Sequence, residues 1–108
     1  MRIRFHEKLY SDGISDRRLS SIKKKVEKGF PKLKLFLITL PLNSQGILEV
    51  YWYPELLQEV YRKVTGELVV VGVAYDRNAA FELIEQIISE IGVQGDYIPV
   101  KEFFEESR

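Results

Sequence analysis

The fold is decided by the stretch Glu67-Leu68-Val69-Val70-Val71-Gly72-Val73-Ala74-Tyr75. It is rich in β-branched residues and apolar without interruption, which predicts a central strand in a parallel or mixed sheet with helices on both faces. Residues 33–40 are apolar on both faces beyond Lys34 and predict a second internal strand. Residues 2–10 alternate between apolar and polar side chains, which predicts an edge strand covered on one side only.

Helices are expected between these strands. Ser15 and Asp76 are suited to cap helices over residues 15–28 and 76–91, and Gly29 is suited to end the first of them. Pro54 fits the first turn of a third helix. The apolar stripe of that helix would consist of Leu56, Leu57, Val60, Tyr61 and Val64.

The expected fold class is therefore α/β: a single small domain over residues 1–108, with the order β-α-β-α-β-α-β and a mostly parallel or mixed four-stranded sheet with flanking helices. The fourth strand is placed at residues 96–101, and Pro99 confines it to an edge. Residues 47–53 stay open, because their aromatic residues favour a strand while their apolar spacing extends the helical stripe that follows. The side chains expected to be inaccessible are Leu37, Val70, Val71, Val73, Leu83, Ile84, Ile87 and Ile88.

Charge is divided unevenly along the chain, although the formal net charge is +0. Residues 1–34 hold 11 Lys and Arg against 4 Asp and Glu, whereas residues 35–108 hold 5 against 12. A basic end attracts phosphates or acidic surfaces, and an acidic end repels them. The alternative is that the two sets of charges meet within one folded monomer.

The basic helix 15–28 is the main candidate for a nucleic-acid or phosphate surface. Some of its cations lie opposite the apolar stripe and others on one flank of it. Together with Lys32 and Lys34 they are numerous enough to neutralise several phosphates. The alternative interpretation is an ordinary solvated face, and the aromatic residues are not interleaved with the cations. The candidate contacts are Arg17, Arg18, Lys24, Lys25 and Lys28.

A second candidate surface is the aromatic cluster Tyr51, Trp52 and Tyr53, which contains the one tryptophan of the chain. Amphipathic aromatic residues of this kind are typical of protein interfaces, and a contact with a second copy or another protein is one interpretation. Packing over the end of the sheet is the other.

Little in the sequence indicates catalysis. There is no cysteine, and His6, the one histidine, is expected at the surface between cations. We expect no metal site and no cofactor, because neither acidic ligand loops nor a dinucleotide or P-loop fingerprint is present, and Gly72 is expected to admit a closely packed helix. No apolar run is long enough for a membrane span and no signal peptide is evident, so a cytoplasmic location is expected.

Three segments resemble a group of short bacterial cytosolic proteins of about this length with no assigned function. They are residues 37–40, residues 47–51 with 56–61, and residues 70–75 with 79–84, so the resemblance lies within residues 33–91. It implies a small cytoplasmic bacterial protein and supplies no catalytic residues.

The function expected from these features is a small binding or regulatory module that self-associates as a homodimer. The alternative is a nucleic-acid or phosphate-binding protein that uses the basic helix. A third possibility is a small hydrolase or transferase with its site near Thr39 and Asp76, at the carboxyl ends of the central strands.

Overall fold

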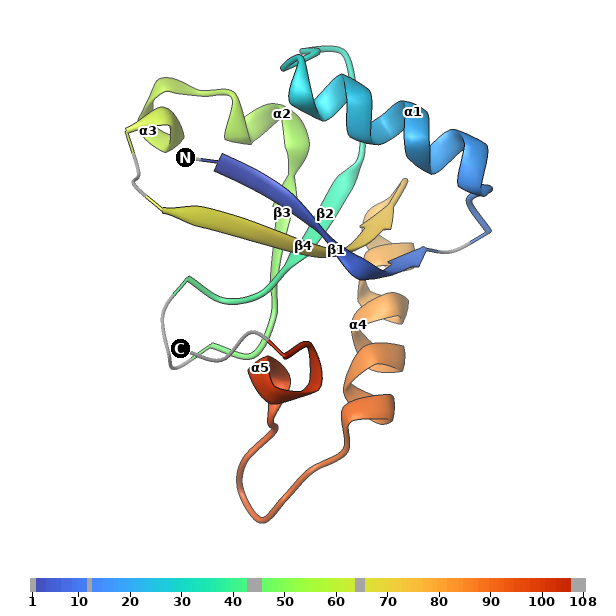
Figure 1. Cartoon of the computed structure of the whole chain (residues 1–108), viewed down its shortest axis with the longest axis vertical. Coiled ribbons are helices and arrows are strands. Elements are labelled where there is room, and N and C mark those ends of the chain that lie inside the picture. The colour runs from blue at the N-terminus through green and yellow to red at the C-terminus, as the bar shows by residue number, and fades with distance from the viewer. Residues whose placement is uncertain (1, 12, 43–45, 64–65, 106–108) are drawn as a thin grey trace.

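The computed structural model describes residues 2–11, 13–42, 46–63 and 66–105, and one four-stranded sheet with the strand order β1-β4-β2-β3 runs through this part of the chain (Figure 1). β1 (Arg2–Ser11) pairs in parallel with β4 (Glu67–Ala74). β2 (Phe36–Thr39) is antiparallel to β4 and to β3 (Glu49–Trp52). The α/β class, the mixed sheet and the central position of the 67–75 stretch are therefore confirmed.

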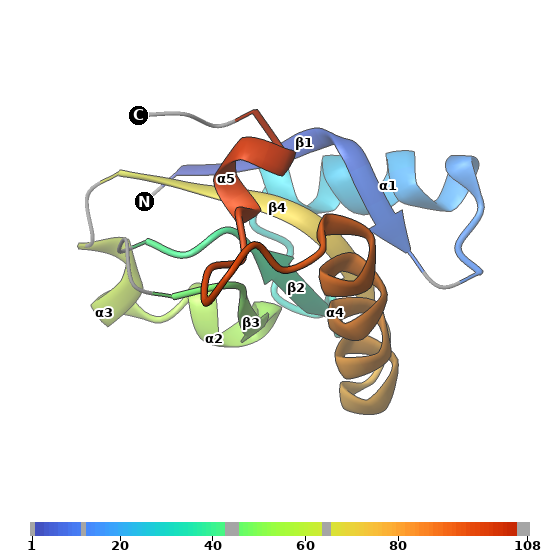
Figure 2. The same cartoon turned by 90° about the horizontal axis from the view of Figure 1, so that it is seen from below.

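Helices cover both faces of the sheet. α1 (Asp16–Glu27) and the short helix α2 (Tyr53–Leu56) lie on one face, where they pack on side chains such as Leu37 and Val70. α4 (Arg77–Ile91) and α5 (Val100–Phe103) lie on the other face, in front of the sheet when the molecule is seen from below (Figure 2). This layering is what buries β4 on both sides.

The expected core is confirmed at six of its eight positions, since Leu37, Val70, Val71, Val73, Leu83 and Ile87 are all buried. Ile84 and Ile88 are only partly buried. Each follows a buried residue of α4 by one position, and one step along a helix turns a side chain by about 100° away from the sheet.

The prediction of a strand at residues 96–101 is wrong. Gln94 and Tyr97 close a turn by bridging to each other, and the chain then forms α5 from Val100. Val100 and Phe104 are 4% and 1% exposed, and a spacing of four residues places both on one face of a helical turn. Helical packing of these two side chains therefore replaces the expected strand.

The stretch 47–53, for which a strand and a helix were both considered, contains a strand and the first residue of a helix. Residues 49–52 are β3, and α2 begins at Tyr53. The helix expected after Pro54 is broken at Gln58, whose backbone is extended, and α3 (Glu59–Arg62) follows it. Val60 is 66% exposed and does not join the stripe, and Val64 lies outside the described residues. The order of elements is thus β-α-β-β-α-α-β-α-α rather than the expected alternation.

Gly72 lies at an irregularity in the register between β2 and β4. Ile38 pairs with Gly72 but Thr39 pairs with Val70, so Val71 is an extra residue in β4. A Cβ atom on Gly72 would lie 3.0 Å from Ile38 Cδ1 and 3.2 Å from Ile38 Cβ. The sequence had led us to expect that a helix packed against Gly72. The neighbour that requires glycine here is instead the Ile38 side chain of the adjacent strand.

We predict that Gly72→Ala lowers the free energy of unfolding by about 1–3 kcal/mol, because the added methyl group overpacks this contact. Ile38→Val removes the nearest atom, and alone it should cost about 0.5–1.5 kcal/mol. In urea denaturation, the double variant should lose less than the sum of the two single losses. Additive losses would contradict the contact.

Candidate functional site

The ends of α1 are fixed by two local motifs. At its start, the Ser15 hydroxyl accepts a hydrogen bond from the Arg18 N–H at 3.2 Å. At its end, Gly29 has φ +67°, and the N–H groups of Gly29 and Phe30 donate to the carbonyls of Val26 and Lys25 at 3.1 and 3.0 Å. This is a Schellman arrangement, and it turns the chain back towards the last turn of the helix.

The returning segment forms a second wall beside α1. Leu33 and Leu35 are buried under the helix, whereas Lys32, which precedes them, and Lys34, which lies between them, are exposed. Phe30 is 41% exposed, and the Lys25 ammonium lies 5.5 Å from the centre of its ring. Alternation along this segment therefore anchors its apolar side chains and leaves its cations at the surface.

The third wall comes from the end of β4. Tyr75 directly follows the strand, is 45% exposed, and its hydroxyl accepts a hydrogen bond from Arg18 Nη1 at 3.3 Å. The three walls enclose a groove of about 540 Å³, which we call the basic groove. Among the described residues no Asp or Glu lines it. Its lining consists of Ser15, Arg17, Arg18, Ser21, Ile22, Lys25, Phe30, Lys32, Leu33, Lys34 and Tyr75.

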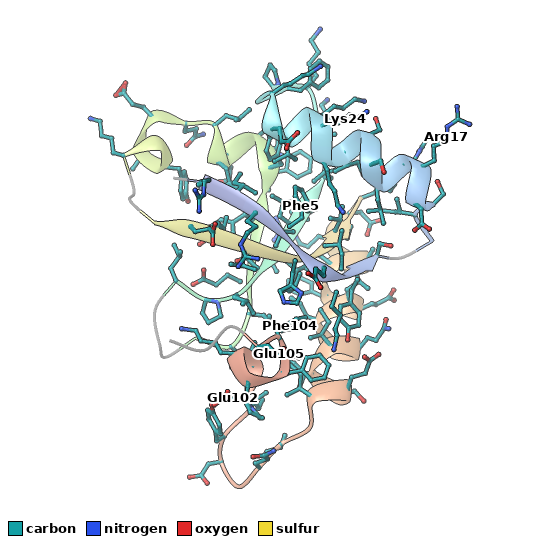
Figure 3. All side chains as sticks on the ribbon, in the orientation of Figure 1. Phe5, Arg17, Lys24, Glu102, Phe104 and Glu105 are labelled. Atoms are coloured by element: carbon teal, nitrogen blue, oxygen red, sulfur yellow. The ribbon has the colours of Figure 1, made fainter. Side chains whose placement is uncertain are left out.

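The structure divides the five candidate nucleic-acid contacts into two sets. Arg17, Arg18 and Lys25 line the basic groove, but Lys24 and Lys28 do not. Figure 3 shows Arg17 projecting from the first turn of α1 and Lys24 farther along the same helix. The groove lies on the flank of the helix that faces residues 30–34, and not on the centre of its polar face, because the returning chain packs against that flank.

Two aromatic residues of the groove were missed from the sequence. Phe30 was overlooked because it follows Gly29, at the point where the expected helix ends. Tyr75 is 57 residues away from Arg18, its hydrogen-bond partner, and only the tertiary fold brings it there. The aromatic rings are therefore interleaved with the cations in space although they are not in the sequence.

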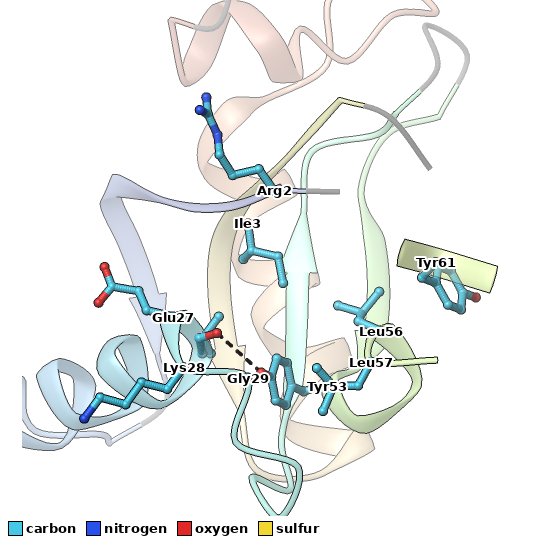
Figure 4. Close-up of a pocket in the computed structure, with 10 residues that line it drawn as sticks. Arg2, Ile3, Glu27, Lys28, Gly29, Tyr53, Leu56, Leu57 and Tyr61 are labelled. Carbon is cyan, nitrogen blue, oxygen red and sulfur yellow. Dashed lines mark hydrogen bonds between the residues drawn. The ribbon is translucent and has the colours of Figure 1, made fainter. Parts of the chain in front are cut away.

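A second cavity, of about 600 Å³, lies between β1, the end of α1 and the α2–α3 segment (Figure 4). Apolar and polar surface contribute about equally to its lining, and the apolar part includes Ile3, Leu56 and the fully buried ring of Tyr53. The charged side chains of its lining carry both signs: Arg2 and Lys28 are positive and Glu27 is negative. Without a dominant charge, this cavity is a less specific feature than the basic groove.

The polar face of β1 is not a second free basic surface. Arg2 and Arg4 bind the Glu67 carboxylate at 2.7 and 3.0 Å, and their hydrogen bonds lower the pKa of Glu67. His6 is part-buried rather than at the surface. Its Nδ1 accepts from the Lys8 N–H at 3.0 Å, so its Nε2 carries the proton and donates to the Phe104 carbonyl at 2.8 Å. His6 thus holds α5 on the sheet.

The aromatic cluster 51–53 is also divided. Tyr53 is fully buried and its N–H donates to the Leu35 carbonyl at 2.9 Å, so its side chain is core and not interface. Tyr51 is partly buried; its hydroxyl donates to Glu49 at 2.9 Å, and burial together with this carboxylate raises its pKa to about 12. Trp52 is partly buried against Phe36, with 4.8 Å between the ring centres.

The structure does not bring together Thr39 and Asp76, the two residues near which a hydrolase or transferase site was expected. Because β2 runs antiparallel to β4, Thr39 pairs near Val70, while Asp76 lies beyond the other end of β4. Thr39 is fully buried, and the Asp76 carboxylate caps α4 by accepting from the Ala79 N–H at 2.8 Å. Within the described ranges no group of three His, Asp or Glu is placed to hold a metal ion.

The comparisons with known proteins add no function: no family model, curated protein or solved structure matches the chain. The resemblance to short bacterial proteins therefore stays a prediction. In the part of the chain that the structure describes, no helix has the length and apolarity needed to cross a membrane.

Tyr53 and Trp52 test the assignment of Tyr53 to the core and of Trp52 to a partly exposed position. Tyr53→Ala should lower the free energy of unfolding by about 3–5 kcal/mol, because it empties a fully buried site. Trp52→Ala should cost less, because Trp52 is already partly exposed. Urea denaturation followed by circular dichroism measures both losses. A larger loss for Trp52→Ala would show that the burial of these two rings has been assigned the wrong way round.

Proposed function

We propose that this protein binds single-stranded nucleic acid in the basic groove. The observation that carries the proposal is the lining itself: five cations, Arg17, Arg18, Lys25, Lys32 and Lys34, surround two exposed aromatic rings, and no carboxylate faces them within the described residues. Non-specific single-strand binding sites combine these same two components, a basic track for the phosphates and aromatic platforms for the bases. The absence of cysteine supports a role in the reducing cytoplasm.

The aromatic rings favour a single strand over a duplex. Phe30 and Tyr75 are both more than two-fifths exposed, although apolar rings are normally buried. In a duplex the base faces are already stacked on one another, whereas an unpaired base offers a free face. Each stacked base is worth about 1–3 kcal/mol, which is enough to separate single strands from duplexes with the same phosphate charge.

The distribution of charge supports the same face of the molecule. Figure 3 shows Arg17 and Lys24 on α1 on one side of the sheet, and Glu102 and Glu105 in the α5 region on the other. A polyanion approaching α5 is repelled, while one approaching α1 is attracted. The cations of α1 and the carboxylates near α5 are thus separated in space. The two charged parts of the sequence meet along β1, where Arg2 and Arg4 bind Glu67 and where Lys8 lines a pocket together with Glu105.

The charge component is tested by salt dependence. If all five cations contact phosphates, the affinity for an oligothymidylate should fall about 100-fold between about 50 and 200 mM salt, because counterions are released on binding. The double variant Lys25→Gln/Lys32→Gln should flatten the log–log slope by about 1.4, the value for two lost contacts on a single strand. Fluorescence anisotropy of labelled oligonucleotide measures both quantities.

The matched control is Lys24→Gln/Lys63→Gln, which has the same net charge but changes two exposed lysines outside the basic groove. It should keep the slope of the unaltered protein. Equal effects of the two double variants would reduce the proposal to non-specific charge attraction, and no binding at 50 mM salt would eliminate it.

The stacking component is tested by Phe30→Ala and Tyr75→Ala. Each should weaken single-strand binding by about 5- to 150-fold while leaving duplex binding nearly unchanged. Phe81→Ala is the control, because Phe81 is 50% exposed on α4 and does not line the basic groove. An effect of Phe81→Ala equal to that of Tyr75→Ala would remove the stacking role.

We propose self-association as a second function, on the observation that β3 is an edge strand with Ile47, 40% exposed, just before it. An unpaired strand edge is a template for pairing with another chain. Light scattering should give a mass near twice 12.6 kDa, and a Pro in place of Val50 should return it to the monomer. A monomer at about 100 μM would eliminate an affinity in the low micromolar range.

A further inference from the structure

A row of residues across three strands leads from the basic groove to Trp52. Trp52 pairs with Phe36 across β3 and β2, and Phe36 pairs with Ala74 across β2 and β4. Tyr75, which lines the groove, is the next residue after Ala74. Because neighbouring strands are about 4.8 Å apart, the backbone of Trp52 lies about 10 Å from that of Ala74.

The side chains at the far end of this row repeat the chemistry of the groove. The rings of Phe36 and Trp52 lie 4.8 Å apart at an angle of 47°, and both are partly exposed. Arg77, exposed at the start of α4, places its guanidinium 5.4 Å from the centre of the Phe36 ring. A cation close to an aromatic ring is the same combination that Lys25 and Phe30 form in the groove.

We propose that a single strand bound in the basic groove continues past Tyr75 over the end of the sheet and stacks a base on the Phe36–Trp52 pair, with Arg77 at an intervening phosphate. This inference rests on the proposed function. The Tyr75 side chain meets α1, whereas Phe36 packs on the α4 face, so the strand crosses the end of the sheet and the backbone span of about 10 Å is a lower limit for its path. The path therefore takes at least about three nucleotides at the 3.4 Å spacing of a stacked strand. The Phe36–Trp52 pair therefore sets how many nucleotides the protein covers.

The acidic residue beside this path does not block it. Asp76 lies between Tyr75 and Arg77 in the sequence, but its carboxylate is directed at the first turn of α4, where it accepts the Ala79 N–H at 2.8 Å. Arg77 is thus the charged group that the end of the sheet offers to a phosphate. Because Phe36 and Trp52 are held by paired strands, the platform is rigid before the strand binds.

The experiment uses the single tryptophan of the chain as its reporter. Oligothymidylates of about 4 and about 12 nucleotides, a range that brackets compact single-strand sites, are titrated into the whole protein. Calorimetry measures binding, and tryptophan fluorescence measures stacking on Trp52. Both oligonucleotides should bind, but the longer one should quench the fluorescence strongly and the shorter one should quench it far less.

Two variants separate the platform from the groove. Trp52→Ala and Arg77→Gln should each weaken binding of the longer oligonucleotide by about 5-fold or more and leave the shorter one unchanged. Arg77→Gln changes an exposed side chain, so the test survives if Trp52→Ala fails to fold. Phe81→Ala, on the same helix as Arg77, should change neither.

The outcomes distinguish the two proposals. Binding of both oligonucleotides without tryptophan quenching, or with no effect of Arg77→Gln, would overturn the extended path while the groove stands. Binding of neither would overturn the groove and the path together. Quenching by both that Lys25→Gln/Lys32→Gln leaves unchanged would show that Trp52 binds the strand independently of the groove, and would overturn the continuous path.

Discussion

The structure depends on one constraint: β4 is paired with a strand on each side and covered by helices on both faces. Its interior side chains are consequently apolar, and no charged group lies along it between Glu67 and Asp76. The extra residue at Val71 is accommodated because Gly72 lets Ile38 approach within contact distance. Polar chemistry is therefore confined to the two ends of β4.

Those two ends differ in how their charges are balanced. At the amino end, Glu67 is bound by Arg2 and Arg4 from the neighbouring parallel strand, so charge is neutralised locally. At the carboxyl end, Tyr75 meets Arg18 through a hydroxyl group, which accepts a hydrogen bond but carries no charge. Among the described residues no carboxylate lines the groove beside its cations, and this difference between the two ends is why we propose the carboxyl end as the place where a polyanion binds.

Local signals made the elements predictable, and long-range pairing made the site unpredictable. Ser15, Gly29 and Asp76 act within a few residues of their own positions, and the helices they bound were predicted correctly. The antiparallel pairing of β2 with β4 was not predictable, since it depends on which strands meet. That pairing separates Thr39 from Asp76, and the fold likewise brings Tyr75 to Arg18. The charge asymmetry indicated α1 as a binding surface. The aromatic residues beside α1, Phe30 and Tyr75, could be identified only from the tertiary structure.

A net charge of zero does not weaken the case for a polyanion ligand. The described part of the molecule extends 41 Å along its longest axis, whereas the Debye length at physiological ionic strength is about 8 Å. Charges on α5 are therefore screened from a ligand on α1, and the cations around one groove act together. The carboxylates near α5 still repel a polyanion that approaches that face. The separation of the two charges therefore favours approach to α1, and the local attraction there remains although the net charge is zero.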